Sequence, residues 1–194
     1  MGVFSGGILV VLLLGAYCIW DVRRAYRMGR VFEAHTVAAV WVVYLLHGAL
    51  TIGAAWRSVW PLPLDAVTAV TAGSALVAGG LALALAGSVE FGSVRRMSGM
   101  IENKVVCSGV YRWSRNPQNV GWELAFLGTA LLGRSGFALL LAALFWAMFL
   151  AYLPAEEKHL ERVFGDEYRA YRSRTARFLG RPSVRRDGQG GIDQ

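Results

Sequence analysis

The chain has 194 residues, of which 55% are hydrophobic and only 17% are charged, and its formal net charge is +7. A soluble domain of this length does not need so many apolar residues, so the composition indicates an integral membrane protein. The positive charge does not indicate nucleic-acid binding, because basic runs interleaved with aromatic residues are absent and charged cytoplasmic loops explain it. Cys18 and Cys107 are too few for a disulfide framework and lack metal-ligand spacing.

Five apolar runs follow one another along the chain, each close to the ~20 residues that cross a bilayer core. The first lacks a basic leading region and a small-residue cleavage site, so we expect a retained span rather than a signal peptide. Glycine and alanine residues in the third apolar run predict close helix packing. The short joint 133–136 predicts an antiparallel hairpin between the last two. The expected spans are residues 3–20, 36–56, 66–87, 117–133 and 136–153.

The distribution of lysine and arginine predicts an orientation for these spans. Of the 20 basic residues, only Arg57 and Arg134 fall in the second and fourth loops. The other 18 fall in the first loop, the third loop and the C-terminal segment. Because cytoplasmic loops carry the excess of basic residues, five spans place the N-terminus outside and the C-terminus in the cytoplasm.

The segment after the last span alternates charged residues with an apolar stripe over residues 154–179. The spacing of three and four residues predicts an amphipathic helix on the protein or membrane surface. Gly165 and Asp166 are expected to break it into two pieces. The polar residues 183–194 are expected to be disordered. The predicted fold class is therefore all-α integral membrane, with five transmembrane helices and a cytoplasmic C-terminal helical lid.

A polar, cationic segment, residues 104–122, joins the third and fourth spans. Asn116 followed by Pro117 predicts a helix start, with Asn116 as the N-cap and proline at the first helical position. Arg112 and Arg115 lie beside that start. Free backbone N–H groups, the helix dipole and two guanidinium groups form a suitable site for an anionic ligand group.

Two adjacent carboxylates, Glu156 and Glu157, follow the last span. The hairpin brings them beside the start of the fourth span, where Arg112 and Arg115 are their expected partners. Successive helix residues point about 100° apart, so one glutamate can face a pocket while the other pairs with arginine. S-adenosylmethionine carries both a carboxylate and a cation and would suit this face. The alternative is an interfacial salt bridge that only holds the hairpin together.

Other polar residues carry weaker expectations. His47, alone in the second span, favours a hydrogen bond between helices over a substrate contact. Glu90 and Glu102, in the polar segment, are expected to be solvated. Glu123 could face the pocket or pair with an arginine, and both readings stay open.

Two blocks of sequence resemble the integral-membrane methyltransferases of the isoprenylcysteine carboxyl methyltransferase and phosphatidylethanolamine N-methyltransferase group. The family pattern is G-x-Y-x-x-x-R-H-P-x-Y-x-G, followed by E-E-x-x-L-x-x-x-F-G-x-E-Y-x-x-Y. Here the first block is Gly109-x-Tyr111-x-x-x-Arg115-Asn116-Pro117-x-Asn119-x-Gly121. The second runs from Glu156 to Tyr171. The resemblance covers about residues 104–179, and the first three spans match only in hydropathy.

The resemblance implies a pocket for S-adenosylmethionine beneath the C-terminal helices, within one membrane domain over residues 1–182. Residues 1–103 would form the first three spans and a loop, and residues 104–182 the cofactor-binding half. Arg115 and Arg174 would lie near the reacting groups and act in catalysis. The cofactor would be bound by Lys104, Val106, Gly109, Tyr111, Arg112, Asn116, Pro117, Gly121, Glu156 and Glu157.

The implied reaction is methyl transfer to a lipophilic acceptor in the membrane. Asn116 and Asn119 depart from the usual histidine and tyrosine, which leaves the acceptor open between a carboxylate, an amine, a thiol and a hydroxyl. A phospholipid amine N-methyltransferase, a sterol-reductase-like NADPH oxidoreductase and a non-enzymatic scaffold are the alternatives. Expected partners are the lipophilic substrate and membrane lipids, with no nucleic acid, no metal and an open oligomeric state.

Overall fold

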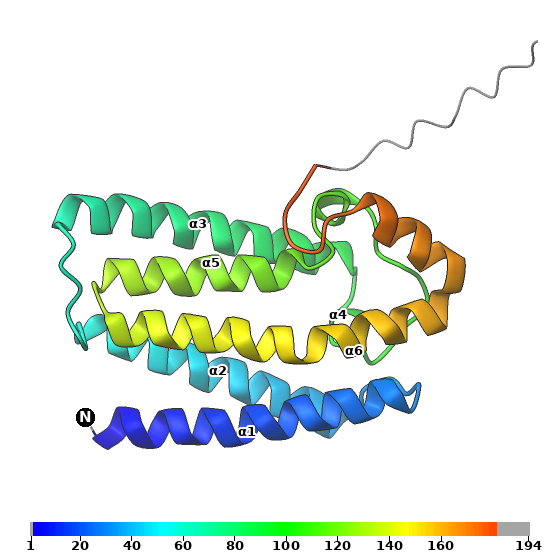
Figure 1. Ribbon diagram of the computed structural model, residues 1–194, viewed down its shortest axis with the longest axis horizontal. Helices are drawn as coiled ribbons and strands as arrows, with labels where there is room; N and C mark the ends of the chain where they lie inside the picture. The colour runs from blue at the N-terminus through cyan, green and yellow to red at the C-terminus, as the bar shows by residue number, and fades with distance from the viewer. Residues whose placement is uncertain (1, 182–194) are drawn as a thin grey trace, which may run out of the picture.

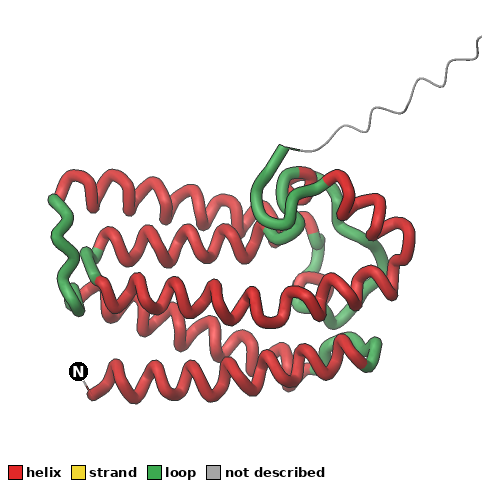
Figure 2. Tube along the Cα trace, viewed as in Figure 1, coloured by secondary structure: helices red, strands yellow, loops and turns green. Residues whose placement is uncertain are grey.

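The computed structural model of the protein describes residues 2–181, so the expected disorder of residues 183–194 lies outside the described residues. Across that range the fold is all-helical, and its β structure is limited to one isolated bridge between Pro61 and Ser135. Figures 1 and 2 show long helices running side by side, with loops gathered at their two ends. The elements are α1 (Gly2–Arg27), α2 (Ala34–Trp56), α3 (Ala66–Glu90), α4 (Val94–Met97), the 3₁₀ turn η1 (Gly109–Arg112), α5 (Pro117–Leu132) and α6 (Gly136–Arg174).

Within the described residues, four helices are long and apolar enough to cross a membrane: α1, α2, α3 and α6. The remaining apolar helix, α5, has 16 residues, which makes it about 24 Å long at 1.5 Å per residue. It nevertheless lies within the bundle beside α3 (Figure 1). Four of the predicted apolar runs fall inside one of these helices, and the fourth run extends one residue beyond the end of α5. The agreement is close because the length of an apolar run is read directly from the sequence.

Helices α3 and α5 pack with their backbones almost in contact. A Cβ added to Gly80 would lie 2.5 Å from the Gly121 carbonyl oxygen, and one added to Gly121 would lie 2.6 Å from the Gly80 carbonyl oxygen. Neither position has room for a side chain. The close packing predicted from the small residues of the third span is therefore confirmed.

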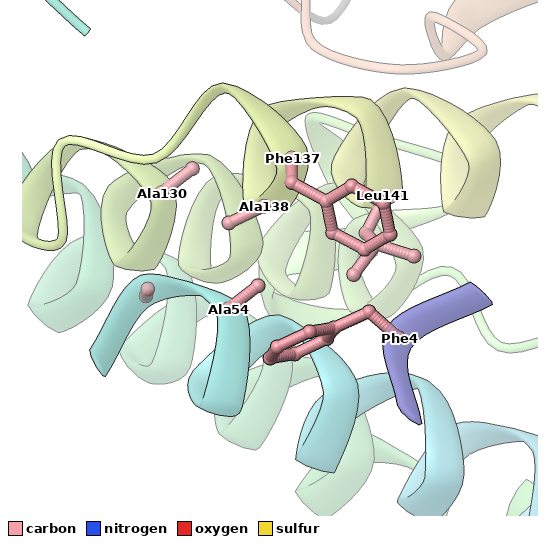
Figure 3. Close-up of a cluster of buried hydrophobic side chains, with 7 residues drawn as sticks. Phe4, Ala54, Ala130, Phe137, Ala138 and Leu141 are labelled. Atoms are coloured by element: carbon pink, nitrogen blue, oxygen red, sulfur yellow. The ribbon is translucent and has the colours of Figure 1, made fainter. Parts of the chain in front are cut away.

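The end of the bundle where α1 begins is closed by apolar side chains from four helices (Figure 3). Phe4 meets Phe137 edge to face, with ring centroids 5.7 Å apart. Ala54 and Ala138 are fully buried beside them, where α2 and α6 approach closely. The cluster consists of Phe4, Ala54, Ala55, Ala130, Phe137, Ala138 and Leu141.

The opposite end of the bundle is polar and is covered by the C-terminal part of the chain. Gly165 adopts φ 53° and ψ −125° inside α6, so the break predicted at this glycine is confirmed. Beyond the kink the helix turns back toward the start of α5 (Figure 1). The residues after α6 form backbone hydrogen bonds with the segment that precedes α5. In one of them the Arg115 N–H donates to the Ala176 carbonyl at 2.9 Å.

The start of α5 differs from the sequence prediction in one respect. Pro117 is the first helical residue, as expected, but the Asn116 side chain makes no capping hydrogen bond. Its Nδ2 instead donates to the Arg177 carbonyl at 2.9 Å. The predicted capping role of Asn116 is therefore wrong, because the returning C-terminal segment offers its amide a different partner.

Candidate active site

A cavity of about 370 Å³ opens between α1, α2, α5, α6 and the segment that precedes α5. Its polar end lies beside Arg115, Glu156 and Glu157, and its apolar arm extends into the bundle as far as Phe145 and His47. Phe145 and Glu156 are about three turns apart on α6, or ~16 Å along its axis. The cavity is thus long, with charge at one end only.

Glu157 is the buried centre of an ion cluster at the polar end. Its Oε1 lies 2.7 Å from Nη1 of Arg115, and its Oε2 lies 2.6 Å from Nη2 of Arg177. The Arg177 Nε also donates to Oε1 at 3.0 Å, which makes that pair bidentate. The expected contact between Arg115 and the two glutamates is confirmed for Glu157. Arg112 takes no part, because its side chain is exposed outside the cavity lining.

Glu156 and Arg115 each have a side-chain atom at this end that remains without a partner. The Glu156 Oε2 is buried and accepts no hydrogen bond, and the Arg115 Nε is buried and donates none, among residues 2–181. Burial raises the pKa of Glu156 to about 7, with further contributions from the negative charges of Glu157 and Glu102. The prediction that one glutamate faces a pocket while the other pairs with arginine is confirmed.

Glu102 belongs to the same end of the cavity, and its predicted solvation is wrong. Its side chain is only 14% exposed, and its Oε2 lies 2.7 Å from Nε2 of His159, which is 1% exposed. The His159 ring packs on Tyr26 of α1 with centroids 4.8 Å apart. Sequence analysis missed this pair, although His159 lies three residues after Glu156 and so falls on the same face of α6.

Tyrosines complete the wall beneath the C-terminal segment. The Tyr171 hydroxyl donates to the Tyr111 carbonyl at 2.8 Å, which ties α6 to η1. The Tyr168 hydroxyl accepts from Nη1 of Arg115 at 3.4 Å. Burial is the main reason that the pKa values of Tyr111, Tyr168 and Tyr171 are raised, so all three remain neutral donors at physiological pH.

Aromatic rings line the apolar arm. Trp41 is 42% exposed at its outer edge, and Tyr44 lies further in, with its hydroxyl donating to Oδ1 of Asn119 at 3.0 Å. Tyr44 also meets Phe145 edge to face at 5.5 Å. The arm therefore connects the exposed surface of α2 with the polar end.

His47 lies at the inner limit of this arm and is completely buried. Neither ring nitrogen has a partner in hydrogen-bonding geometry within the described part of the chain, although the Leu141 carbonyl lies nearby. The predicted hydrogen bond between helices stays a prediction, with the Leu141 carbonyl of α6 as its candidate partner. The ring packs against Phe126 and Phe145, with centroids 5.1 and 5.8 Å away.

The structure brings some predicted site residues together and leaves others outside. Gly109 has φ +50°, and a Cβ there would collide with Glu90, so its role is in the turn. Arg112 and Arg174 are exposed, while Pro117 and Gly121 are buried where α5 packs on α3. None of these five lines the cavity. The predicted residues that do are Lys104, Val106, Tyr111, Arg115, Asn116, Glu156 and Glu157.

Four long apolar helices and an internal cavity with charged groups at one end define an all-helical integral membrane protein with a candidate small-molecule site. The family model of phospholipid methyltransferases matches residues 68–167, just over half of the chain. The protein belongs to the phospholipid methyltransferase family. The match includes all but the first two residues of α3, which the motif resemblance did not reach.

Individual relatives match a shorter stretch. A protein-S-isoprenylcysteine O-methyltransferase of Schizosaccharomyces pombe is 35% identical over 74 residues, which is 38% of this chain and 31% of the relative. The protein of the same name from Mus musculus is 37% identical over 71 residues, 36% of this chain and 25% of the relative. The matched stretch is thus about a quarter to a third of the length of these curated relatives. No solved structure matches the chain.

Proposed function

We propose that this protein transfers a methyl group from S-adenosylmethionine to a lipophilic acceptor within the membrane. Family membership and the names of the relatives support the reaction class. The observation that carries the proposal is the pair of unsatisfied groups at the polar end, the Glu156 Oε2 and the Arg115 Nε. Buried polar atoms are rarely left unpaired, so these two call for a ligand that carries both a cation and an anion.

The residues present fit such a cofactor. Arg115 is held by Glu157 on one side and keeps its Nε for the carboxylate of an amino acid group. Glu156 supplies the acceptor for the adjacent ammonium. Lys104, Val106, Tyr111 and Asn116 complete the lining around them. When bound, S-adenosylmethionine supplies a methyl group already activated by its sulfonium, so no covalent enzyme intermediate is needed.

The work left to the protein is alignment and the exclusion of water. The Arg115–Glu157–Arg177 cluster fixes the end of α6 against the start of α5 and the C-terminal segment. Tyr168 and Tyr171 cover the same end. Residues 154–181 would therefore act as a lid over the cofactor, within one domain spanning residues 1–182.

The acceptor would enter from the bilayer through the arm that begins at the exposed Trp41. Rings and aliphatic side chains line this route, and the polar contact between Tyr44 and Asn119 marks where a reacting carboxylate, amine or hydroxyl would come to rest. Both prenylcysteine carboxylates and phospholipid amines suit this arrangement. Lipid extracts incubated with the protein and deuterium-labelled S-adenosylmethionine, analysed by mass spectrometry, would identify the acceptor by its mass shift.

Ligand titration tests the function itself. Isothermal titration in detergent should show binding of S-adenosylmethionine and of S-adenosylhomocysteine, and NADPH should not bind. If neither adenosyl ligand binds, the proposed function is wrong. Binding of NADPH alone would favour an oxidoreductase instead.

For the topology, we propose five crossings with the N-terminus outside and the site in the cytoplasm. The two cysteines provide the test, because Cys107 is exposed in the segment before α5 and Cys18 is buried in α1. A membrane-impermeant maleimide should label Cys107 in inverted vesicles and not in right-side-out vesicles or cells. A Cys107→Ser variant should abolish that label, and labelling of intact cells would reverse the orientation.

A further inference from the structure

Three acidic side chains line the polar end of the cavity, and they differ in how their charge is compensated. Glu157 faces two guanidinium groups, so its charge is fully balanced within the protein. Glu156 forms no ion pair in the described part of the chain. Glu102 contacts only an imidazole, whose charge depends on its protonation. Glu102 and Glu156 are therefore the two acids of the cavity that no arginine or lysine of residues 2–181 pairs with.

His159 holds the Glu102 carboxylate through one ring nitrogen. Its Nε2 lies 2.7 Å from Oε2 of Glu102, while its Nδ1 is buried and has no partner among residues 2–181. The face of the ring packs against Tyr26, with centroids 4.8 Å apart. A carboxylate carries two acceptor oxygens, so Oε1 of Glu102, which forms no hydrogen bond with the described residues, is available to a ligand.

The nearby cations form no ion pair with Glu102. Arg162 donates to the Tyr26 and Arg27 carbonyls at the end of α1. Arg96 donates to the Phe91 carbonyl. Lys104 forms no ion pair with either acid in the structure of residues 2–181. The cavity therefore holds two carboxylates, Glu102 and Glu156, that no arginine or lysine of the described residues pairs with. They lie close enough to act on each other electrostatically.

We propose that Glu102 is the carboxylate that faces the sulfonium of the methyl donor, and that His159 is the residue that positions it. This inference rests on the proposed function. In S-adenosylmethionine the carboxylate and ammonium share one carbon, so Arg115 and Glu156 must meet them together. The sulfonium is separated from that carbon by two methylenes, so a different acid of the cavity can face it. Glu102 reaches the cavity from a different segment, the loop before η1, and is available for that contact.

This arrangement distinguishes the methyl donor from the spent cofactor. Methyl transfer breaks the bond from sulfur to the methyl carbon, forms a bond from that carbon to the acceptor nucleophile, and leaves the bonding pair on sulfur. The sulfonium becomes a neutral thioether and loses its attraction to Glu102. The ammonium and carboxylate contacts are unchanged, so the product keeps only part of the binding free energy of the substrate.

The test compares dissociation constants for S-adenosylmethionine and S-adenosylhomocysteine in the full-length protein. Glu102→Gln should weaken S-adenosylmethionine binding about 10-fold, as expected for loss of a charge-assisted contact, with less than about a 2-fold change for S-adenosylhomocysteine. Sinefungin, which carries an ammonium in place of the sulfonium, should follow S-adenosylmethionine. Glu161→Gln makes the same charge change on the surface of α6 and should alter neither constant.

Substitutions at His159 separate positioning from packing. His159→Gln retains an N–H donor toward Glu102 and should largely preserve the ratio of the two dissociation constants. His159→Leu removes the donor and should raise the dissociation constant for S-adenosylmethionine relative to that for S-adenosylhomocysteine, toward the Glu102→Gln value. Equal losses for both ligands, or no loss in Glu102→Gln, would overturn the inference. If the wild-type protein binds neither ligand, the proposed function itself has failed.

Discussion

The two sides of the helical bundle pack in contrasting ways. Helices α3 and α5 meet through glycine, with backbone atoms in contact and no room for a side chain at Gly80 or Gly121. Around the cavity, helices α1, α2 and α6 are held apart by large side chains such as Tyr44 and Phe145, and they enclose most of its volume. Close backbone packing leaves no internal volume, whereas side-chain packing can surround one.

The contrast indicates a division of roles within the fold. The α3–α5 pair provides a stiff support, and α5 carries the residues at its start that reach the polar end of the cavity. The other three helices provide the walls. Two neighbouring residues of the chain differ in a similar way, because Glu157 pairs with two arginines whereas Glu156 faces the cavity without a partner. Substitutions that change only one member of each compared pair can test these differences.

The largest expected effect comes from Glu157→Gln. It leaves the buried guanidinium of Arg115 without its partner, and breaking a buried ion pair on one side costs about 3–5 kcal/mol. Thermal unfolding in detergent should show a large loss of stability, together with loss of ligand binding. Asp166→Asn, at a side chain that is 97% exposed, is the control and should have little effect. Wild-type stability in Glu157→Gln would contradict the structural role of the ion cluster.

The next effect tests the glycine contact of α3 with α5. Gly80→Ala places a Cβ 2.5 Å from the Gly121 carbonyl oxygen, and we expect it to cost about 1–3 kcal/mol through forced separation of the helices. Gly79→Ala is the matched control, because nothing lies within 4 Å of its Cβ position. Its better helix propensity should leave the stability unchanged or slightly higher. Equal midpoints for the two variants in thermal unfolding would count against the packing described here.

A smaller effect, dependent on pH, is expected at Glu156. Its pKa is raised from 4.5 to about 7, so the folded protein binds a proton that the unfolded chain releases, and stability falls as pH rises between these values. Glu156→Gln should therefore unfold at a higher temperature than the wild type at pH 8 and at a similar temperature at pH 4.

Cofactor affinity in the wild type should rise through pH 7 as the Glu156 carboxylate ionises. In Glu156→Gln that rise should be absent from the titrations.

The smallest effects are expected at the exposed arginines. Arg112→Ala and Arg174→Ala should each change the dissociation constant of S-adenosylmethionine less than about 2-fold, because exposed charges contribute little to such contacts. Arg115→Ala, by contrast, should abolish measurable binding. A large loss in Arg174→Ala would show that the C-terminal segment moves when ligand binds and brings this residue to the site.

The sequence by itself determined the all-helical class, the five apolar helices, the hairpin that makes Arg115 and Glu157 neighbours, and the break at Gly165. These features depend on run length, short connections and local backbone preference, all of which are encoded within a few residues. Only the tertiary structure decided that Arg177 rather than Arg112 pairs with Glu157, that Asn116 binds the C-terminal segment, and that Glu102 meets His159. The last two residues are 57 positions apart, and contacts at such separations depend on how the loops and the returning chain pack, which no local pattern records.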